Sequence, residues 1–140
     1  MNFEDISRRG LVLLGCGKMG LAMLAGWLRD GLDPKVVWVI DPQPSGWLLE
    51  QGAHVNQSLP PQPAIILVAV KPQLMEQALP QIKAFGNAPE TVILSVAAGT
   101  PIKTYEDMLG MYTPVIRAMP NTPAAVGKGI TAVSTNSHVS

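Results

Sequence analysis

The chain has 140 residues, 47% of them hydrophobic and 14% charged, which is enough apolar material for the core of one compact soluble domain. Ten basic and ten acidic residues give a formal net charge of zero, so no basic surplus favours a nucleic acid or an anionic membrane as partner. The single cysteine, Cys16, has no disulfide partner and no companion at metal-ligand spacing, so we expect a reducing compartment and no metal site. No apolar stretch is long enough for a membrane span or a signal core, and we therefore expect a cytoplasmic protein.

Several hydrophobic runs predict strands. Four of them are continuous and lack polar alternation, at 11–14, 36–40, 64–70 and 92–96. This pattern is typical of strands that are buried on both faces of a parallel sheet. Two shorter candidates follow at 114–118 and 130–133, and the small polar residues 134–140 resemble a frayed end or the first part of something longer.

Helical spacing of apolar residues fills the intervals between these runs. The clearest case has apolar or small residues at i, i+3, i+4, i+7 and i+8, and Gly31 is placed to end the helix; the residues are Met19, Ala22, Met23, Gly26 and Trp27. The segment 73–85 is also helical in pattern, but Pro80 should break or kink it.

A further helix is predicted after the fourth run. Thr100 would be its cap and Pro101 its first residue, and it would stop near Gly110. Its inward-facing residues would be Ile102, Tyr105, Met108 and Leu109. Strands that alternate with helices in this way predict an α/β fold, a Rossmann-type doubly wound and mostly parallel sheet that forms a single domain over residues 1–140.

A glycine-rich loop connects the first strand to the first crossover helix. Its sequence is Gly15-Cys16-Gly17-Lys18-Met19-Gly20. Such glycines permit a tight turn and a close approach of the backbone to a pyrophosphate, and the helix N-terminus adds free N–H groups. Asp41 ends the second strand about 20 residues after the last glycine, where an acid would bond the adenosine ribose. These residues predict a dinucleotide site.

Some residues of this loop have an ordinary alternative. Gly15 to Gly20 could form a simple turn and Asp41 could cap a helix, although the strand-loop-helix context favours dinucleotide binding. Lys18 could steer the pyrophosphate or be a solvated turn residue, and Cys16 indicates no chemistry. The acid Asp41, followed by residues 42–45 without Arg or Lys, favours NADH over NADPH, while Gln43 or Ser45 could still bond a phosphate.

Three later segments indicate a family. They are Val68-Ala69-Val70-Lys71-Pro72-Gln73, Ser95-Val96-Ala97-Ala98-Gly99 and Arg117-Ala118-Met119-Pro120-Asn121-Thr122-Pro123. In order and spacing the chain resembles the pyrroline-5-carboxylate reductases, over residues 11–133. The resemblance implies the N-terminal, cofactor-binding half of such an enzyme.

The resemblance also implies roles for residues. Val70, Lys71 and Pro72 would contact the adenosine side of NADH or NADPH, and Ala97, Ala98 and Gly99 would let the backbone approach the nicotinamide ribose. Beside the nicotinamide and the substrate would lie Met119, Pro120 and Asn121, the last with an amide that donates and accepts. Without the resemblance, Lys71 would be an ordinary surface lysine, Met119 a core residue and Arg117 an ion-pair partner. Neither His54 nor His138 belongs to a cluster, so we expect both to be structural or exposed.

The implied reaction is hydride transfer from the nicotinamide to the imine of 1-pyrroline-5-carboxylate, which yields L-proline. No catalytic side chain is predicted, because the reaction needs mainly positioning and electrostatics. The family's helical C-terminal half, which forms the dimer and closes the substrate pocket, has no counterpart in this chain. We therefore expect the 140 residues alone to have low turnover and homo-oligomers to require that half. The alternatives are a Rossmann dehydrogenase of another small acid, such as a β-hydroxyacid or arogenate dehydrogenase, and a non-catalytic NAD(P)-binding regulatory domain.

Overall fold

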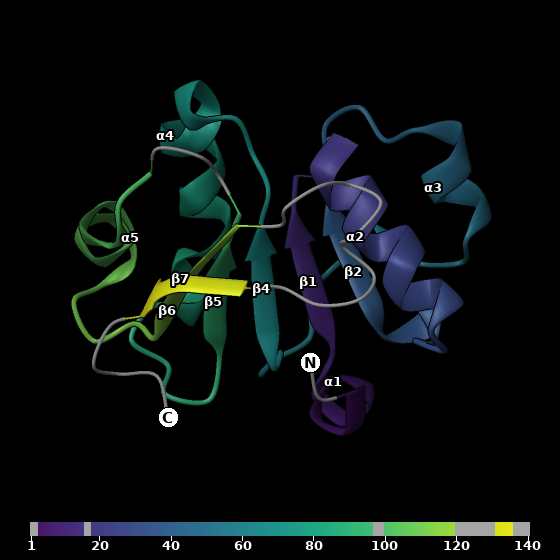
Figure 1. Ribbon diagram of the computed structural model, residues 1–140, viewed down its shortest axis with the longest axis horizontal. Helices are drawn as coiled ribbons and strands as arrows, with labels where there is room; N and C mark the ends of the chain where they lie inside the picture. The colour runs from purple at the N-terminus through teal and green to yellow at the C-terminus, as the bar shows by residue number, and fades with distance from the viewer. Residues whose placement is uncertain (1–2, 16–17, 97–99, 120–130, 136–140) are drawn as a thin grey trace.

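The computed structural model describes residues 3–15, 18–96, 100–119 and 131–135. They form a seven-stranded sheet with the order β3-β2-β1-β4-β5-β6-β7 (Figure 1). The strands are β1 (Leu11–Leu14), β2 (Val37–Ile40), β3 (His54–Val55), β4 (Ile65–Val68), β5 (Val92–Ser95), β6 (Val115–Met119) and β7 (Thr131–Thr135). All pairings are parallel except that of β6 with β7, which is antiparallel.

The chain reverses its direction of progress through the sheet at β1. Strand β1 pairs with β2 on one side and with β4 on the other, so that Leu14 lies opposite both Ile40 and Val68. A strand order that turns back at this point leaves a crevice at the carboxyl ends of the strands, where ligands of such sheets bind. The loops after β1, β2 and β4 are therefore the first place to look for a site.

Burial explains why the predicted runs form parallel strands. Every residue of β1 is at most 1% exposed, and its side chains alternate between two cores. Leu11 and Leu13 belong to one core, whereas Val12 and Leu14 belong to the other. Because both faces are covered, polar residues have no place in these strands, and the uninterrupted hydrophobic runs follow.

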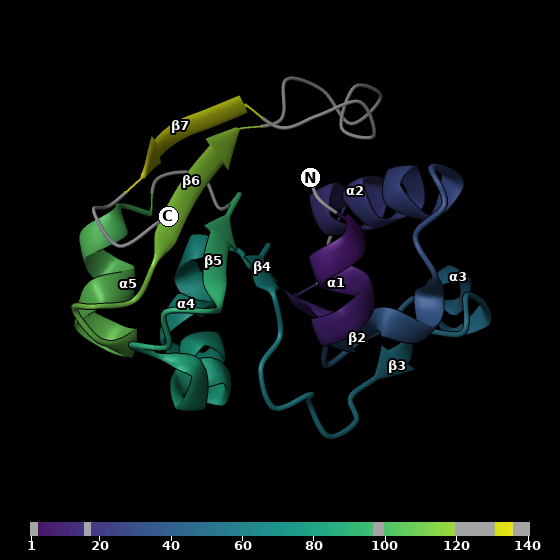
Figure 2. The same cartoon turned by 90° about the horizontal axis from the view of Figure 1, so that it is seen from below.

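Helices cover both faces of the sheet. On one face lie α1 (Phe3–Arg9), α2 (Lys18–Arg29) and α3 (Gly46–Glu50), and on the other lie α4 (Met75–Ala78) and α5 (Ile102–Leu109), as Figure 2 shows for α1, α2, α4 and α5. Three short 3₁₀ helices complete the described elements: η1 (Pro34–Val36), η2 (Pro72–Leu74) and η3 (Leu79–Phe85). The doubly wound, mostly parallel α/β fold is confirmed.

The crossover helices agree with the sequence pattern in most details. In α2 the apolar stripe buries Met23, Leu24 and Trp27, and Gly31 follows the helix with a φ of 109°. Helix α4 ends at Ala78, and Pro80 lies in the first turn of η3, so the predicted break at this proline is confirmed.

The predicted cap of α5 is wrong by one residue. Pro101 is the N-cap, because its ψ of 159° is extended, and no side chain caps this helix. Thr100 is buried instead. The inward positions were predicted correctly, since Tyr105 and Leu109 are buried and Ile102 and Met108 pack against the same core.

Several elements lie outside the sequence prediction. Helices α1 and α3 and the two-residue strand β3 had no recognisable pattern, and Ser134 and Thr135, expected in a frayed end, belong to β7. His54 in β3 is structural, as expected: its ring stacks on Trp38 at 4.6 Å, and its Nε2 lies 2.9 Å from the Lys35 carbonyl. His138 lies outside the described residues.

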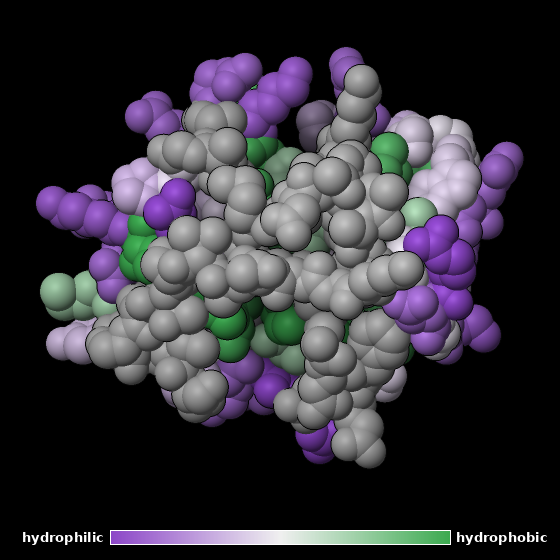
Figure 3. Space-filling view, viewed as in Figure 1, coloured by the Kyte–Doolittle hydropathy of each residue, from purple (hydrophilic) through white to green (hydrophobic). Residues whose placement is uncertain are grey.

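Figure 3 shows one face of the molecule, coloured by hydropathy. In Figure 3, hydrophilic residues follow the outline of the molecule, whereas hydrophobic residues show between them nearer the centre. Among the described residues, no helix combines the length and the apolar character needed to cross a membrane. Nor do the described His, Cys, Asp and Glu side chains form a group that could hold a metal ion.

Candidate functional site: a crevice at the carboxyl ends of β1, β2 and β4

Gly15 occupies the position where the loop leaves β1. Its φ is 79°, and its N–H donates to the Ile40 carbonyl at 2.8 Å. A Cβ at this position would lie 2.5 Å from Val70 Cγ1 and 3.3 Å from the Ala69 oxygen. Both the backbone conformation and the close approach of the β4 extension therefore require glycine.

The start of α2 lies just beyond this turn. The helix begins at Lys18 and Gly20 is buried in its first turn, whereas Cys16 and Gly17 lie outside the described residues. The first N–H groups of a twelve-residue helix have no intrahelical acceptor, and they favour an anion. The glycine backbone at Gly15 and the N-terminus of α2 therefore lie together beyond the carboxyl end of β1.

Asp41 is held in place by Asn56. The Asp41 N–H donates to Asn56 Oδ1 at 2.9 Å, and Asn56 Nδ2 donates back to the Asp41 carbonyl at 2.8 Å. Asp41 Oδ1 accepts from the Gln43 N–H at 2.9 Å, which fixes the carboxylate against its own turn. Its position at the end of β2, next to the switch point, is the one predicted for a ribose-binding acid.

Asn56 itself was missed by the sequence reasoning. It has a φ of 54°, a left-handed conformation that asparagine tolerates better than most residues, and its N–H donates to the Val39 carbonyl at 2.8 Å. A lone asparagine after a two-residue strand carries no sequence signal, so only the fold reveals that it positions Asp41.

The segment after β4 forms the other wall of the crevice. Strand β4 ends at Val68, and the Ala69 N–H donates to the Leu14 carbonyl at 3.0 Å, which keeps the extension beside β1. Val70 is half-buried against Gly15, whereas Lys71 is exposed and its carbonyl accepts from Leu74 at the start of η2. Pro72 is the first residue of η2.

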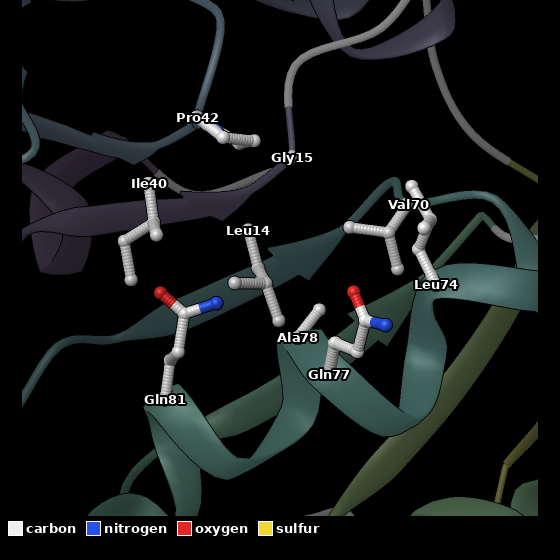
Figure 4. A pocket seen from close by; sticks show the side chains of 9 residues that line it. All are labelled: Leu14, Gly15, Ile40, Pro42, Val70, Leu74, Gln77, Ala78 and Gln81. Carbon is white, nitrogen blue, oxygen red and sulfur yellow. The ribbon is translucent and has the colours of Figure 1, made fainter.

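A pocket of about 150 Å³ opens between these segments (Figure 4). Its lining comes from β1, β2, the β4 extension and the α4–η3 region, and it consists of Leu14, Gly15, Ile40, Pro42, Val70, Leu74, Gln77, Ala78 and Gln81. The predicted residues Gly15 and Val70 thus meet in one pocket, and both chain neighbours of Asp41 line it.

Two buried hydroxyl groups, those of Ser95 and Tyr105, lie beyond β4, between the end of β5 and helix α5. The Val96 N–H donates to the Val68 carbonyl at 3.1 Å, so the ends of β4 and β5 lie side by side. Ser95 at the end of β5 hydrogen-bonds the buried Tyr105 hydroxyl. Burial raises the pKa of Tyr105, while the bond to Ser95 and the charge of Arg117 act in the opposite direction.

The nicotinamide-side candidates are for the most part outside the described residues. These are Ala97, Ala98, Gly99, Pro120 and Asn121. Met119 is the last residue of β6, where its backbone pairs with Thr131 of β7. Their predicted roles stay predictions.

A second pocket, of about 280 Å³, lies at the amino ends of strands β1 and β2, away from the crevice. Gly10, which precedes β1, and Val36, which precedes β2, line it. Arg9 on its wall donates to the carbonyls of Gln62, Pro63 and Glu90 and so ties loops together. Because ligands of such sheets bind at the carboxyl ends of strands, the smaller pocket is the candidate site.

Comparison with protein families agrees with this geometry. Residues 10–99, more than half of the chain, match the family described as "NADP oxidoreductase coenzyme F420-dependent". The chain belongs to this family. The matched residues include Gly15, Asp41 and the segment after β4, which together build the crevice of this oxidoreductase-family member.

Individual relatives confirm the resemblance to pyrroline-5-carboxylate reductases. The chain is 37% identical to that enzyme from Escherichia coli (strain K12) over 133 residues, which are 90% of this chain and 49% of the relative. The Pseudomonas aeruginosa enzyme is 30% identical over 136 residues, 93% of this chain and 50% of the relative. The chain thus spans about half the length of the curated relatives it matches.

Solved structures show the same fold. A pyrroline-5-carboxylate reductase from Coxiella burnetii superposes with a TM-score of 0.76 at 24% identity, covering 94% of this chain and 51% of that one. A pyrroline carboxylate reductase from Plasmodium falciparum with NADP bound also has a TM-score of 0.76 at 24% identity, covering 94% of this chain and 49% of that one.

Proposed function

We propose that this chain is the NAD(P)H-binding domain of a pyrroline-5-carboxylate reductase, which reduces the imine of 1-pyrroline-5-carboxylate to L-proline. The assignment of a dinucleotide cofactor rests on Gly15. There is no room for a Cβ at this residue, which lines an apolar pocket and lies just before the start of α2. The assignment of the substrate rests on the relatives, because those that share 30% identity or more with nearly the whole chain include pyrroline-5-carboxylate reductases.

The arrangement suits an extended dinucleotide that crosses the carboxyl edge of the sheet. We expect the pyrophosphate at the N-terminus of α2, with Gly15, Cys16, Gly17, Lys18, Met19 and Gly20 around it. Asp41 would bond the adenosine ribose, and Val70, Lys71 and Pro72 would face the same end. The nicotinamide would lie toward β5 and β6, near Ala97, Ala98, Gly99, Met119, Pro120 and Asn121.

This chain's contribution to the reaction is positioning. The cofactor, when bound, supplies the hydride that adds to the imine carbon, and solvent or a nearby hydroxyl supplies the proton for the nitrogen. Holding two reactants in a productive orientation can remove about 7–11 kcal/mol of a barrier. No acid or base among the described residues is assigned to the reaction, and the task of Gly15, Asp41 and the β4 extension is to fix the cofactor.

We further propose a preference for NADH. A carboxylate at Asp41 would repel a 2′-phosphate on the adenosine ribose, and the Gln43 N–H, which donates to Asp41 Oδ1, holds this carboxylate in place. Ser45 Oγ accepts from the Leu48 N–H as the cap of α3, so its lone pairs are partly engaged. Residues 42–46 contain no basic side chain to hold a phosphate.

Titration calorimetry of the folded chain with NADH and NADPH tests the cofactor assignment. We expect binding in the micromolar to sub-millimolar range, with NADH tighter. Asp41→Asn keeps the acceptor for Gln43 but removes the charge, and it should level or reverse the preference. Glu50→Gln removes an exposed carboxylate outside the crevice and is the matched control. A folded chain that binds neither cofactor would contradict the proposal.

The substrate assignment needs a complete enzyme. A chimera in which this chain replaces the matching half of the E. coli pyrroline-5-carboxylate reductase provides one, because the two share 37% identity over 133 residues. We expect the chimera to form proline from 1-pyrroline-5-carboxylate and to relieve proline auxotrophy. A chimera that folds and binds NADH but reduces a different small substrate, or none, would favour another dehydrogenase or a regulatory domain.

A further inference from the structure

Two amide side chains stand out in the pocket described above. Of its nine lining residues only Gln77 and Gln81 have polar side chains, and the others are apolar or glycine. Both glutamines are exposed, and no hydrogen bond within the described part of the chain holds either amide. They are therefore free to pair with a ligand that enters an otherwise apolar space.

The change of helix type at Pro80 sets where these amides lie. Gln77 belongs to α4 and Gln81 to η3, and the buried Leu79 and Ile82 anchor this segment on the sheet. Figure 4 shows the two amides on either side of Ala78 and Leu14, each directed into the pocket. The small Ala78 leaves an apolar slot with a hydrogen-bonding group at each flank.

The size and position of this slot fit one end of a dinucleotide. About 150 Å³ is less than the roughly 300–1,000 Å³ of pockets that hold a whole drug-sized ligand. Ile40 and Pro42, the chain neighbours of Asp41, line the slot, so it lies next to the acid proposed for the adenosine ribose. The base attached to that ribose is the group that reaches it.

We propose that Gln77 and Gln81 select the base of the cofactor, and that they require a purine with an amino group at position 6. A carboxamide both donates and accepts, and it can therefore pair in a bidentate way with the 6-amino group and N7 of adenine. Leu14, Ala78 and Val70 supply the apolar surface for the flat ring. This inference rests on the proposed dinucleotide function of the crevice.

The test compares NADH with reduced nicotinamide hypoxanthine dinucleotide, which differs only in the base. Hypoxanthine has a carbonyl in place of the amino group, so its N7 edge presents two acceptors side by side, and one amide cannot match both. We expect the wild-type chain to bind NADH about tenfold more tightly, a ratio within the range of one good bidentate pair. Both ligands carry the same reduced nicotinamide, whose fluorescence reports binding.

The variants are Gln77→Leu, Gln81→Leu and the double substitution, which keep most of the side-chain volume without the amides. Gln73→Leu is the matched control, because Gln73 is exposed on η2 but does not line the pocket. The ratio of the two affinities should fall toward one in the double variant and stay unchanged in the control. The ratio is informative even if leucine tightens both ligands through added apolar surface.

The outcomes separate this inference from the function on which it rests. A wild-type chain with equal affinity for both dinucleotides, or a double variant that keeps the wild-type ratio, overturns the role of the amides while dinucleotide binding stands. A folded wild-type chain that binds neither ligand overturns both. Circular dichroism of each variant verifies that the affinities refer to folded protein.

Discussion

Substitution of Gly15 by alanine tests the geometry on which the site depends. An L-residue at a φ of 79° loses about 1–2 kcal/mol of folding free energy relative to glycine. The new Cβ would also lie 2.5 Å from Val70 Cγ1, and relief of such overpacking typically costs about 1–3 kcal/mol. We therefore expect Gly15→Ala to lower the free energy of unfolding by about 2–5 kcal/mol.

A second glycine separates the two contributions. Gly52 has a φ of 86°, but nothing lies within 4 Å of a Cβ built on it. Gly52→Ala should therefore cost only the backbone part, about 1–2 kcal/mol. Val70→Ala removes the Cγ1 atom, so the double variant Gly15→Ala/Val70→Ala should recover about 1–3 kcal/mol relative to the sum of the single changes.

Urea unfolding, followed by the fluorescence of the three tryptophans, of which Trp27 is buried, measures these differences. Titration with NADH should show weaker binding for Gly15→Ala and unchanged binding for Gly52→Ala. Equal destabilisation by the two alanines, together with additive effects of Gly15→Ala and Val70→Ala, would refute the close approach of the β4 extension to the loop after β1.

Three further changes address other parts of the structure. Asn56→Gly keeps the left-handed backbone but removes the amide that holds Asp41, so calorimetry should show several-fold weaker NADH binding; unchanged affinity would mean that Asp41 needs no support. Tyr105→Phe removes a buried hydroxyl bonded to Ser95 and should cost about 1 kcal/mol in urea unfolding. Because burial raises the pKa of Tyr105 in the folded state, the unfolded chain ionises first. The free energy of unfolding should therefore fall as the pH rises above the ordinary tyrosine pKa of about 10, and Tyr105→Phe should flatten that fall. Arg9→Met removes hydrogen bonds to the carbonyls of Gln62, Pro63 and Glu90, so it should lower the melting temperature without a change in NADH affinity. Weaker NADH binding by this variant would mean that the amino ends of the strands influence the site at their carboxyl ends.

The sequence by itself determined the parts of this protein that depend on local patterns. Strands buried on both faces must be apolar throughout, so β1, β2, β4 and β5 were visible as hydrophobic runs. The stripe of α2, the end of α5 at Gly110 and the break at Pro80 follow from helical periodicity and from the restricted backbone of glycine and proline. Gly15 and Asp41 were found because a fixed spacing places them at the ends of consecutive strands.

Only the tertiary structure decided the rest, because it depends on contacts between segments that no local pattern links. Strand β3 has two residues and exists through its pairing with β2, and β7 exists through its antiparallel pairing with β6. Asn56 reaches Asp41 across fifteen positions, and the pocket joins residues as far apart as Leu14 and Gln81. The sequence marks which residues can take part in such contacts, but the sheet order decides which of them meet.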